Sequence, residues 1–199
     1  GVSENNFLGR GIEFSSNLSL TAETIKGLIS FNNQNFKGSN KSLNFSLESS
    51  VTDRMATYGY ESKKTGFSIA SGYEYYEDLY LIRGFSSYVE NLETSASASA
   101  SLKKQKGSSF DNYFNYTFNY DKRDQKYKPT DGFISSFSQN IPVLTESYAL
   151  TNTYSYKNYN EWLSNNIFSF SFYTKATNSL SGKNVKISDR LFLPANKLR

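Results

Sequence analysis

The chain has 199 residues, a formal net charge of +4, and neither cysteine nor histidine. These two absences exclude zinc sites built from Cys and His, and every catalytic triad or dyad that uses His as its base. Tyr and Phe are abundant, with 16 of each, yet mean hydropathy is only −0.59. No apolar run approaches the roughly 18–20 residues of a membrane helix. A chain both polar and aromatic is typical of a membrane β-barrel, whose strands alternate apolar with polar side chains.

The positive charges are scattered through polar segments such as residues 103–106, rather than gathered in one stripe. Scattered lysines of this kind favour solvated loops over a nucleic-acid-binding patch. We therefore expect no nucleic-acid partner.

Alternation of apolar and polar residues is the dominant pattern, and it predicts β-strands. In residues 42–48, for example, Leu43, Phe45 and Leu47 alternate with Ser, Asn and Glu. Because successive strand side chains point to opposite faces, such a segment has one apolar and one polar face. The same pattern recurs over residues 12–20, 113–120 and 167–173.

We predict nine strands, most of them about 10–12 residues long. That length is close to the roughly 9–11 residues of a tilted membrane strand, and exceeds the roughly 5–6 residues usual in globular proteins. Residues 1–5 are compatible with the tail of a further strand. The nine predicted strands cover residues 10–21, 24–33, 41–51, 64–74, 78–91, 110–121, 131–141, 148–158 and 164–174.

The predicted connections differ in length between the two ends of the strands. Short connections on one side and long ones on the other are typical of outer-membrane barrels, which have periplasmic turns and extracellular loops. Residues 95–101 alternate Ser with Ala, and we expect a loop there that contains at most a helical turn. The short connections are at residues 5–9, 75–77 and 158–160, and the long ones are at 52–63, 92–109 and 175 onward. Residues 22–23 are an exception, since they would form an unusually short outer loop.

A soluble β-sandwich would also alternate. Its inner face would be rich in Val, Ile and Leu, and its outer face rich in charge. Here the polar face is mostly Ser, Asn and Thr, and the apolar face is rich in Phe and Tyr. The fold class we predict is therefore all-β, an antiparallel transmembrane β-barrel.

Three local motifs stand out. The first contains Asn6, Leu8, Gly9 and Gly11, and its Asn and Gly residues tolerate the positive φ angles of tight turns. The third is the segment 189–199, which ends in Leu198 and Arg199.

The second motif lies midway along the chain. Pro129 fixes φ and Gly132 closes a turn before the next strand. Asp121, Arg123 and Asp124 could form an ion pair at the strand end, worth little if it is exposed. The residues of this motif are Asp121, Arg123, Asp124, Pro129, Thr130 and Gly132.

In their order and spacing, these motifs resemble those of the bacterial surface antigen family of outer-membrane barrels. That family carries an N-x-L-G-x-G turn, a D-x-R-D…P-T-x-G turn, and a loop ending in (V/L)-R-G-F, of which Leu198 and Arg199 supply the first two positions. The resemblance covers essentially the whole chain. It implies a sixteen-stranded barrel that follows periplasmic POTRA repeats.

By this resemblance, residues 1–199 form part of the barrel domain, from the second strand to the sixth extracellular loop. About nine strands cannot close such a barrel, so we expect an open, curved sheet without the POTRA repeats or the later strands. The resemblance also implies that the sixth loop folds back into the lumen. There Arg199 would face acidic and aromatic groups on later strands.

The resemblance further implies a function without catalysis: insertion and folding of nascent barrel proteins in the bacterial outer membrane. The implied partners are outer-membrane lipid, nascent barrels and, through the POTRA repeats, assembly-complex lipoproteins, with no cofactor. The alternatives are a translocation-assembly barrel, a two-partner secretion transporter and a diffusion porin. An outer-membrane enzyme is disfavoured because the chain has no His and its Asp pair sits beside a turn.

Overall fold

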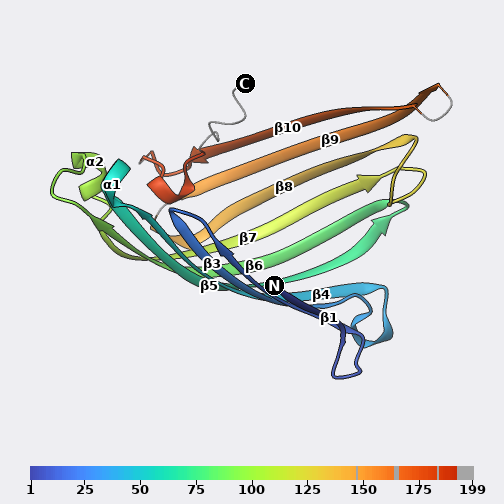
Figure 1. Cartoon of the computed structure of the whole chain (residues 1–199), viewed down its shortest axis with the longest axis horizontal. Coiled ribbons are helices and arrows are strands. Elements are labelled where there is room, and N and C mark those ends of the chain that lie inside the picture. The colour runs from blue at the N-terminus through green and yellow to red at the C-terminus, as the bar shows by residue number, and fades with distance from the viewer. Residues whose placement is uncertain (147, 164–165, 183, 192–199) are drawn as a thin grey trace.

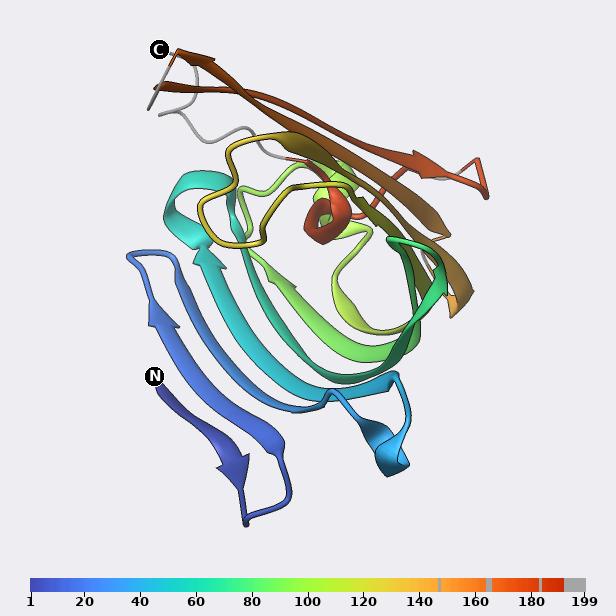
Figure 2. The same cartoon turned by 90° about the vertical axis from the view of Figure 1, so that its right-hand side faces the viewer.

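A computed structural model shows one antiparallel sheet of ten strands, whose order from β1 to β10 follows the chain. The structure describes residues 1–146, 148–163, 166–182 and 184–191. Figure 1 shows the strands side by side, and Figure 2 shows that the sheet is strongly curved but open. The elements are β1 (Val2–Phe7), β2 (Ile12–Leu20), β3 (Thr24–Asn33), η1 (Phe36–Gly38), β4 (Lys41–Arg54), α1 (Met55–Tyr58), β5 (Tyr60–Tyr76), β6 (Leu79–Thr94), α2 (Ala100–Lys103), β7 (Gly107–Asp121), β8 (Gly132–Thr145), β9 (Ala149–Leu163), β10 (Asn166–Ser179) and η2 (Ile187–Asp189).

The predicted class, an all-β open sheet, is confirmed, and the structure has ten strands where about nine were predicted, the tenth lying where residues 1–5 were expected to be the tail of a further strand. Each predicted strand is present, and a tenth, β1, precedes them. Its sequence VSENNF alternates too weakly to mark a strand by itself. It forms because a tight turn brings it back onto β2, where Val2 pairs with Ser16 and Phe7 pairs with Ile12.

Several strands are longer than predicted, so the loops expected at 52–63, 92–109 and 175 onward are shorter. The connection between β4 and β5 covers only residues 55–59, and the one between β6 and β7 covers residues 95–106. The added strand residues are polar on both faces, as in Glu61-Ser62-Lys63. Hydrogen bonding between strands continues there after the alternation of apolar and polar residues has ended. The predicted strands were therefore shorter than the observed ones. The expected helical turn after the Ser-Ala repeat is α2.

The two ends of the sheet are named here by their connections. The turn end carries residues 8–11, 77–78 and 122–131, and the loop end carries α1, α2 and the adjoining ends of β8 and β9. At the loop end the chain leaves β10 and turns back, and residues 184–191, the fold-back segment, include η2. Figure 2 shows this helical turn inside the curve of the sheet.

The two faces of the sheet differ in polarity. Glu90 accepts a hydrogen bond from Ser188 in the fold-back segment, so the side chains that share its face line the concave side. By the strand register these are mainly Ser, Asn and Thr. The convex face is aromatic and aliphatic, and Leu47, Phe67 and Phe85 remain 45%, 40% and 37% exposed. A convex apolar face around a polar interior is the arrangement of a membrane barrel.

The buried apolar core is small and lies at the loop end. It joins Tyr60 and Leu92 on the concave face to Ala98 and Leu102 of the loop between β6 and β7, and Ile187 packs against it. Such a core fixes the loops and the fold-back segment, while the strand ladders hold the sheet itself. Among the described helices, none is long and apolar enough to cross a membrane.

Candidate functional site

The first motif is a tight hairpin turn between β1 and β2. Leu8 and Gly9 have φ of 55° and 69°, and the Arg10 amide donates to the Phe7 carbonyl at 3.2 Å. Two central residues at positive φ are the mark of a type I′ turn, which matches the twist of the flanking strands. Next to this turn, Asn6 Oδ1 accepts a hydrogen bond from the Gly11 amide at 2.7 Å. The predicted hairpin turn is thus present, and the Asn6 side chain closes it through this hydrogen bond.

The second motif contains an ion pair and a separate set of hydrogen bonds made by Asp124. Arg123 donates from Nε and Nη2 to the two carboxylate oxygens of Asp121, both at 2.7 Å. Asp124 takes no part in that pair. Its carboxylate accepts the Thr130 hydroxyl at 2.7 Å and the amides of Thr130 and Asp131 at 3.0 and 3.2 Å. The Thr130 hydroxyl, with backbone amides assisting, holds the pKa of Asp124 below its usual range.

Pro129 and Gly132 shape the same turn. Lys128, just before the proline, has φ of 51°, and Gly132 has φ of 91°. A Cβ on Gly132 would lie 2.1 Å from the carbonyl oxygen of Lys122, a contact that no other residue could make. Gly132 is therefore required where the two sides of the turn approach each other.

The third motif is only partly described. Asp189, Arg190 and Leu191 belong to the fold-back segment at the loop end, whereas Leu198 and Arg199 lie outside the described residues. The lumen-facing role of Arg199 stays a prediction. The structure does not bring the three motifs together, because the first two lie at the turn end and the third begins at the opposite end.

A buried charge cluster that the sequence reading missed holds the fold-back segment. Lys186 Nζ lies 2.8 Å from Asp111 Oδ2 and 3.7 Å from Glu90 Oε2, and the two carboxylate side chains are only 2% and 3% exposed. Lys186 also donates to the hydroxyl of Ser109. Glu90 pairs with Ser109 in the register between β6 and β7, so the neighbouring strands place both acids on one patch of the concave face.

Hydrogen bonds complete the cluster. Ser62 and Ser188 donate to the two oxygens of Glu90 at 2.6 and 2.9 Å, and the Ile187 amide donates to Gln105 at 3.0 Å. Thr145 donates to Asp111 beside a register shift in β7. Buried carboxylates are tolerated only when paired and hydrogen-bonded in this way. The sequence signal for this cluster is an acidic residue at a polar position in each of two neighbouring long strands, Glu90 in β6 and Asp111 in β7.

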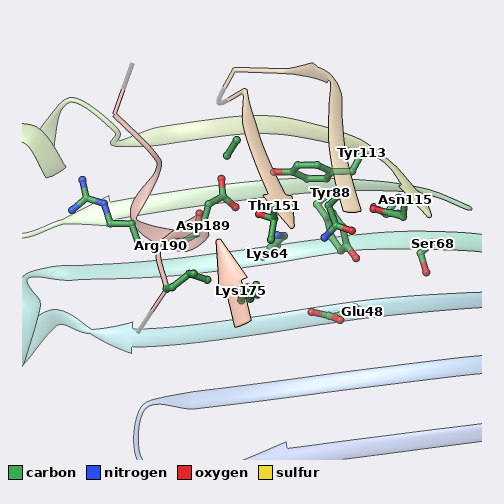
Figure 3. A pocket seen from close by; sticks show the side chains of 15 residues that line it. Glu48, Lys64, Ser68, Tyr88, Tyr113, Asn115, Thr151, Lys175, Asp189 and Arg190 are labelled. Carbon is green, nitrogen blue, oxygen red and sulfur yellow. The ribbon is translucent and has the colours of Figure 1, made fainter. Parts of the chain in front are cut away.

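Beneath the fold-back segment lies a cavity of about 390 Å³. Its lining includes Lys64 and Lys175 from the sheet, together with Asp189. Figure 3 shows Asp189 above the strands, with the hydroxyl of Tyr113 pointing towards it. Among the described residues, the Tyr113 hydroxyl and one oxygen of Asp189 are buried without a hydrogen-bond partner. Burial raises the pKa of Asp189 above its usual range, with Lys64 opposing the shift.

This arrangement binds the chain to itself and offers no obvious metal centre. In the described part of the chain, no group of three or more Asp, Glu, His or Cys residues could hold a metal ion. The chemistry present at the site is charge pairing and hydrogen bonding in a partly dry interior. Such contacts are suited to holding a loop in place.

Comparisons with known proteins bear on the family. The model of the Omp85 superfamily domain matches residues 6–197. The crystal structure of BamA from Haemophilus ducreyi lacking POTRA domains 1–3 superposes with a TM-score of 0.77 at 20% identity, covering 94% of this chain. The chain spans 39% of that structure's length, and at this identity the likeness concerns the fold. A comparison with curated proteins found no match. Because the family model spans nearly the whole chain, the chain belongs to the Omp85 superfamily.

Proposed function

We propose that the chain is part of an outer-membrane barrel assembly factor, which inserts and folds nascent β-barrel proteins in the bacterial outer membrane. The observation that carries this proposal is the fold-back segment, fixed on the concave face by the buried contacts of Lys186. A segment docked on the concave face narrows the interior, and the three motifs in their order argue against a diffusion porin. Membership of the Omp85 superfamily and the BamA-like course of the strands support the same function.

The proposed parent barrel has sixteen strands and is preceded by POTRA repeats, so the ten strands described here make up only part of its wall. Exposed strand edges recruit other strands, since unpaired N–H and C=O groups offer a template. We propose that assembly uses such pairing at the barrel seam, between strands outside this chain. The proposed partners are nascent barrels, outer-membrane lipid and assembly-complex lipoproteins, with neither catalytic residue nor cofactor.

The two motif turns would then serve as periplasmic turns of the barrel. Their contacts fit a structural role, since the side chains of Asn6 and Asp124 each make hydrogen bonds across their own turn. The first turn presents the exposed Leu8 side chain at its tip. We assign Leu198 and Arg199 to the sixth-loop motif, where Arg199 would face the lumen.

Depletion of the full-length protein in its host tests the function. We expect many different outer-membrane barrels to fall together, and the protein itself to be heat-modifiable on semi-native gels. Normal levels of other barrels after depletion would contradict the proposal. Loss of a single secreted substrate, with barrels intact, would instead indicate a two-partner secretion transporter. Loss confined to a few autotransporter-like proteins would indicate a translocation-assembly barrel.

A reconstituted system tests the activity directly. The full-length protein in liposomes should accelerate folding of an added unfolded barrel, measured by its heat-modifiable shift. Empty liposomes and liposomes holding an unrelated closed barrel are the controls. Equal folding rates in all three preparations would contradict the proposal.

A further inference from the structure

Two positively charged side chains flank one tyrosine on the convex face near the turn end. Lys41 on β4 pairs in register with Tyr73 on β5. The guanidinium carbon of Arg83, on β6, lies 5.6 Å from the centre of the Tyr73 ring. Lys41 and Arg83 are exposed. We refer to these three residues as the cation–tyrosine cluster.

The cluster has no protein counter-charge. Within the described residues, no carboxylate lies at ion-pair distance from Lys41 or Arg83, although several other cations of the sheet are paired. On the same convex face, Lys63 Nζ lies 2.7 Å from Glu61, and at the turn end Lys122 Nζ lies 2.6 Å from Asp78. The two charges of the cluster are therefore available to a negative group outside the protein.

The position of Arg83 indicates what that group is. Towards the turn end, the convex face carries Tyr120 and Tyr75, and the Tyr75 ring lies beside the Tyr73 ring, 6.4 Å from centre to centre. In the other direction the convex face carries Ile69 and Phe85. Arg83 thus lies between an aromatic rim and an apolar band. In membrane barrels an aromatic rim marks the level of the lipid headgroups, and a cation is tolerated there far better than at mid-membrane.

We propose that the cation–tyrosine cluster binds the phosphate of a glycerophospholipid in the leaflet at the turn end. The planar guanidinium of Arg83 matches two phosphate oxygens, and Lys41 adds a point charge from the neighbouring strand. Tyr73 packs under the guanidinium and restricts its orientation. The proposal rests on the membrane placement proposed above, and it does not depend on assembly activity.

Native mass spectrometry of the full-length protein in detergent tests the site. The protein is titrated with dioleoyl phosphatidylglycerol, dioleoyl phosphatidylethanolamine and dioleoylglycerol, which lacks phosphate. Arg83→Gln and Lys41→Gln should each weaken binding of the two phospholipids by about fivefold, the effect of one interfacial charge. Binding of dioleoylglycerol should not change. Arg83→Lys keeps the charge but loses the planar match to two phosphate oxygens, so it should weaken binding less than Arg83→Gln does.

Lys63→Gln is the matched control, because Lys63 is exposed on the same face but is paired with Glu61. It should leave phospholipid binding unchanged, and a heat-modifiable gel shift confirms that each variant is folded. Equal binding by wild type and Arg83→Gln would overturn the proposal, as would an equal loss in Lys63→Gln. Loss of dioleoylglycerol binding would also overturn it, since the contact would then be apolar. These outcomes are independent of the assembly assay, so the two proposals can fail separately.

Discussion

The two ends of the sheet are held by different kinds of contact. At the turn end, Arg123 forms an ion pair with Asp121 two residues away, and Asp124 accepts a hydrogen bond from Thr130 six residues away. At the loop end, Lys186 reaches Asp111 across 75 positions, and Ser188 reaches Glu90 across 98. These two turn-end contacts are local, and the Asp121–Arg123 pair is half-buried, whereas the loop-end contacts are long-range and their two carboxylate side chains are only 2% and 3% exposed.

This difference determines how much each contact matters. A half-buried pair at the edge of a turn contributes little net stability, because water can solvate both partners when the pair breaks. A buried pair cannot lose one partner without leaving the other charge in a dry site. The loop end should therefore be more sensitive to single substitutions, and its response should be coupled across several residues.

The largest expected effect comes from Lys186→Met. It leaves Glu90 and Asp111 buried without a cation, which costs about 3–5 kcal/mol while the segment stays docked. We expect the fold-back segment to leave the concave face instead, so that water reaches the two carboxylates. Hydrogen exchange of the Ile187 amide, measured by mass spectrometry on the full-length protein, should become fast.

Two controls accompany that substitution. Lys175→Met removes a cation from the same concave face outside the cluster, and exchange at Ile187 should stay slow. Adding Glu90→Gln and Asp111→Asn to Lys186→Met removes the unpaired charges and should restore part of the protection. Unchanged exchange in Lys186→Met would show that the cluster does not hold the segment.

Gly132→Ala should produce the next largest effect, at the turn end. The new Cβ would need a positive φ and would meet the Lys122 carbonyl oxygen at 2.1 Å, which together cost about 3 kcal/mol. We expect a lower midpoint in urea unfolding of the full-length protein. Gly11→Ala is the matched control: its φ is also positive, at 65°, but nothing lies within 4 Å of the new Cβ. It should cost only about 1 kcal/mol, and equal losses in the two variants would rule out the close approach as the cause.

The smallest expected effect is a pH response of opposite sign at the two ends. The pKa of Asp124 is lowered by the Thr130 hydroxyl, so their hydrogen bond is fully present above the ordinary Asp value of about 3.9 and weakens as pH falls through the lowered value. The pKa of Asp189 is raised by burial, so docking is strongest below the ordinary value and weakens as pH rises through the raised one. Protection factors of the Thr130 and Ile187 amides should therefore change in opposite directions. Asp124→Asn and Asp189→Asn should each abolish one trend, and parallel trends in wild type would contradict this assignment.

Much of the fold and both turns could be predicted from neighbouring residues. Alternation in segments such as 42–48 identified nine strands, because pleating sends successive side chains to opposite faces. The turns at Gly9 and Gly132 were visible in the motifs, but the side-chain roles of Asn6 and Asp124 were not, because the expected ion pair of Asp124 is replaced by hydrogen bonds to Thr130 and Asp131. Strand β1 was weakly marked because its residues are polar on both faces, and only its pairing with β2 makes it a strand.

What tertiary structure alone decided is the interior. No local pattern connects Lys186 to Glu90 and Asp111, because the connection requires β6 and β7 to lie side by side and the chain to return after β10. The same holds for the cation–tyrosine cluster, whose members come from three neighbouring strands. The sequence by itself determined strand periodicity, turn chemistry and the absence of Cys and His. Strand register and sheet curvature determined which charged side chains come into contact. Those contacts join residues far apart in the sequence, and their separation in space cannot be read from the order of residues along the chain.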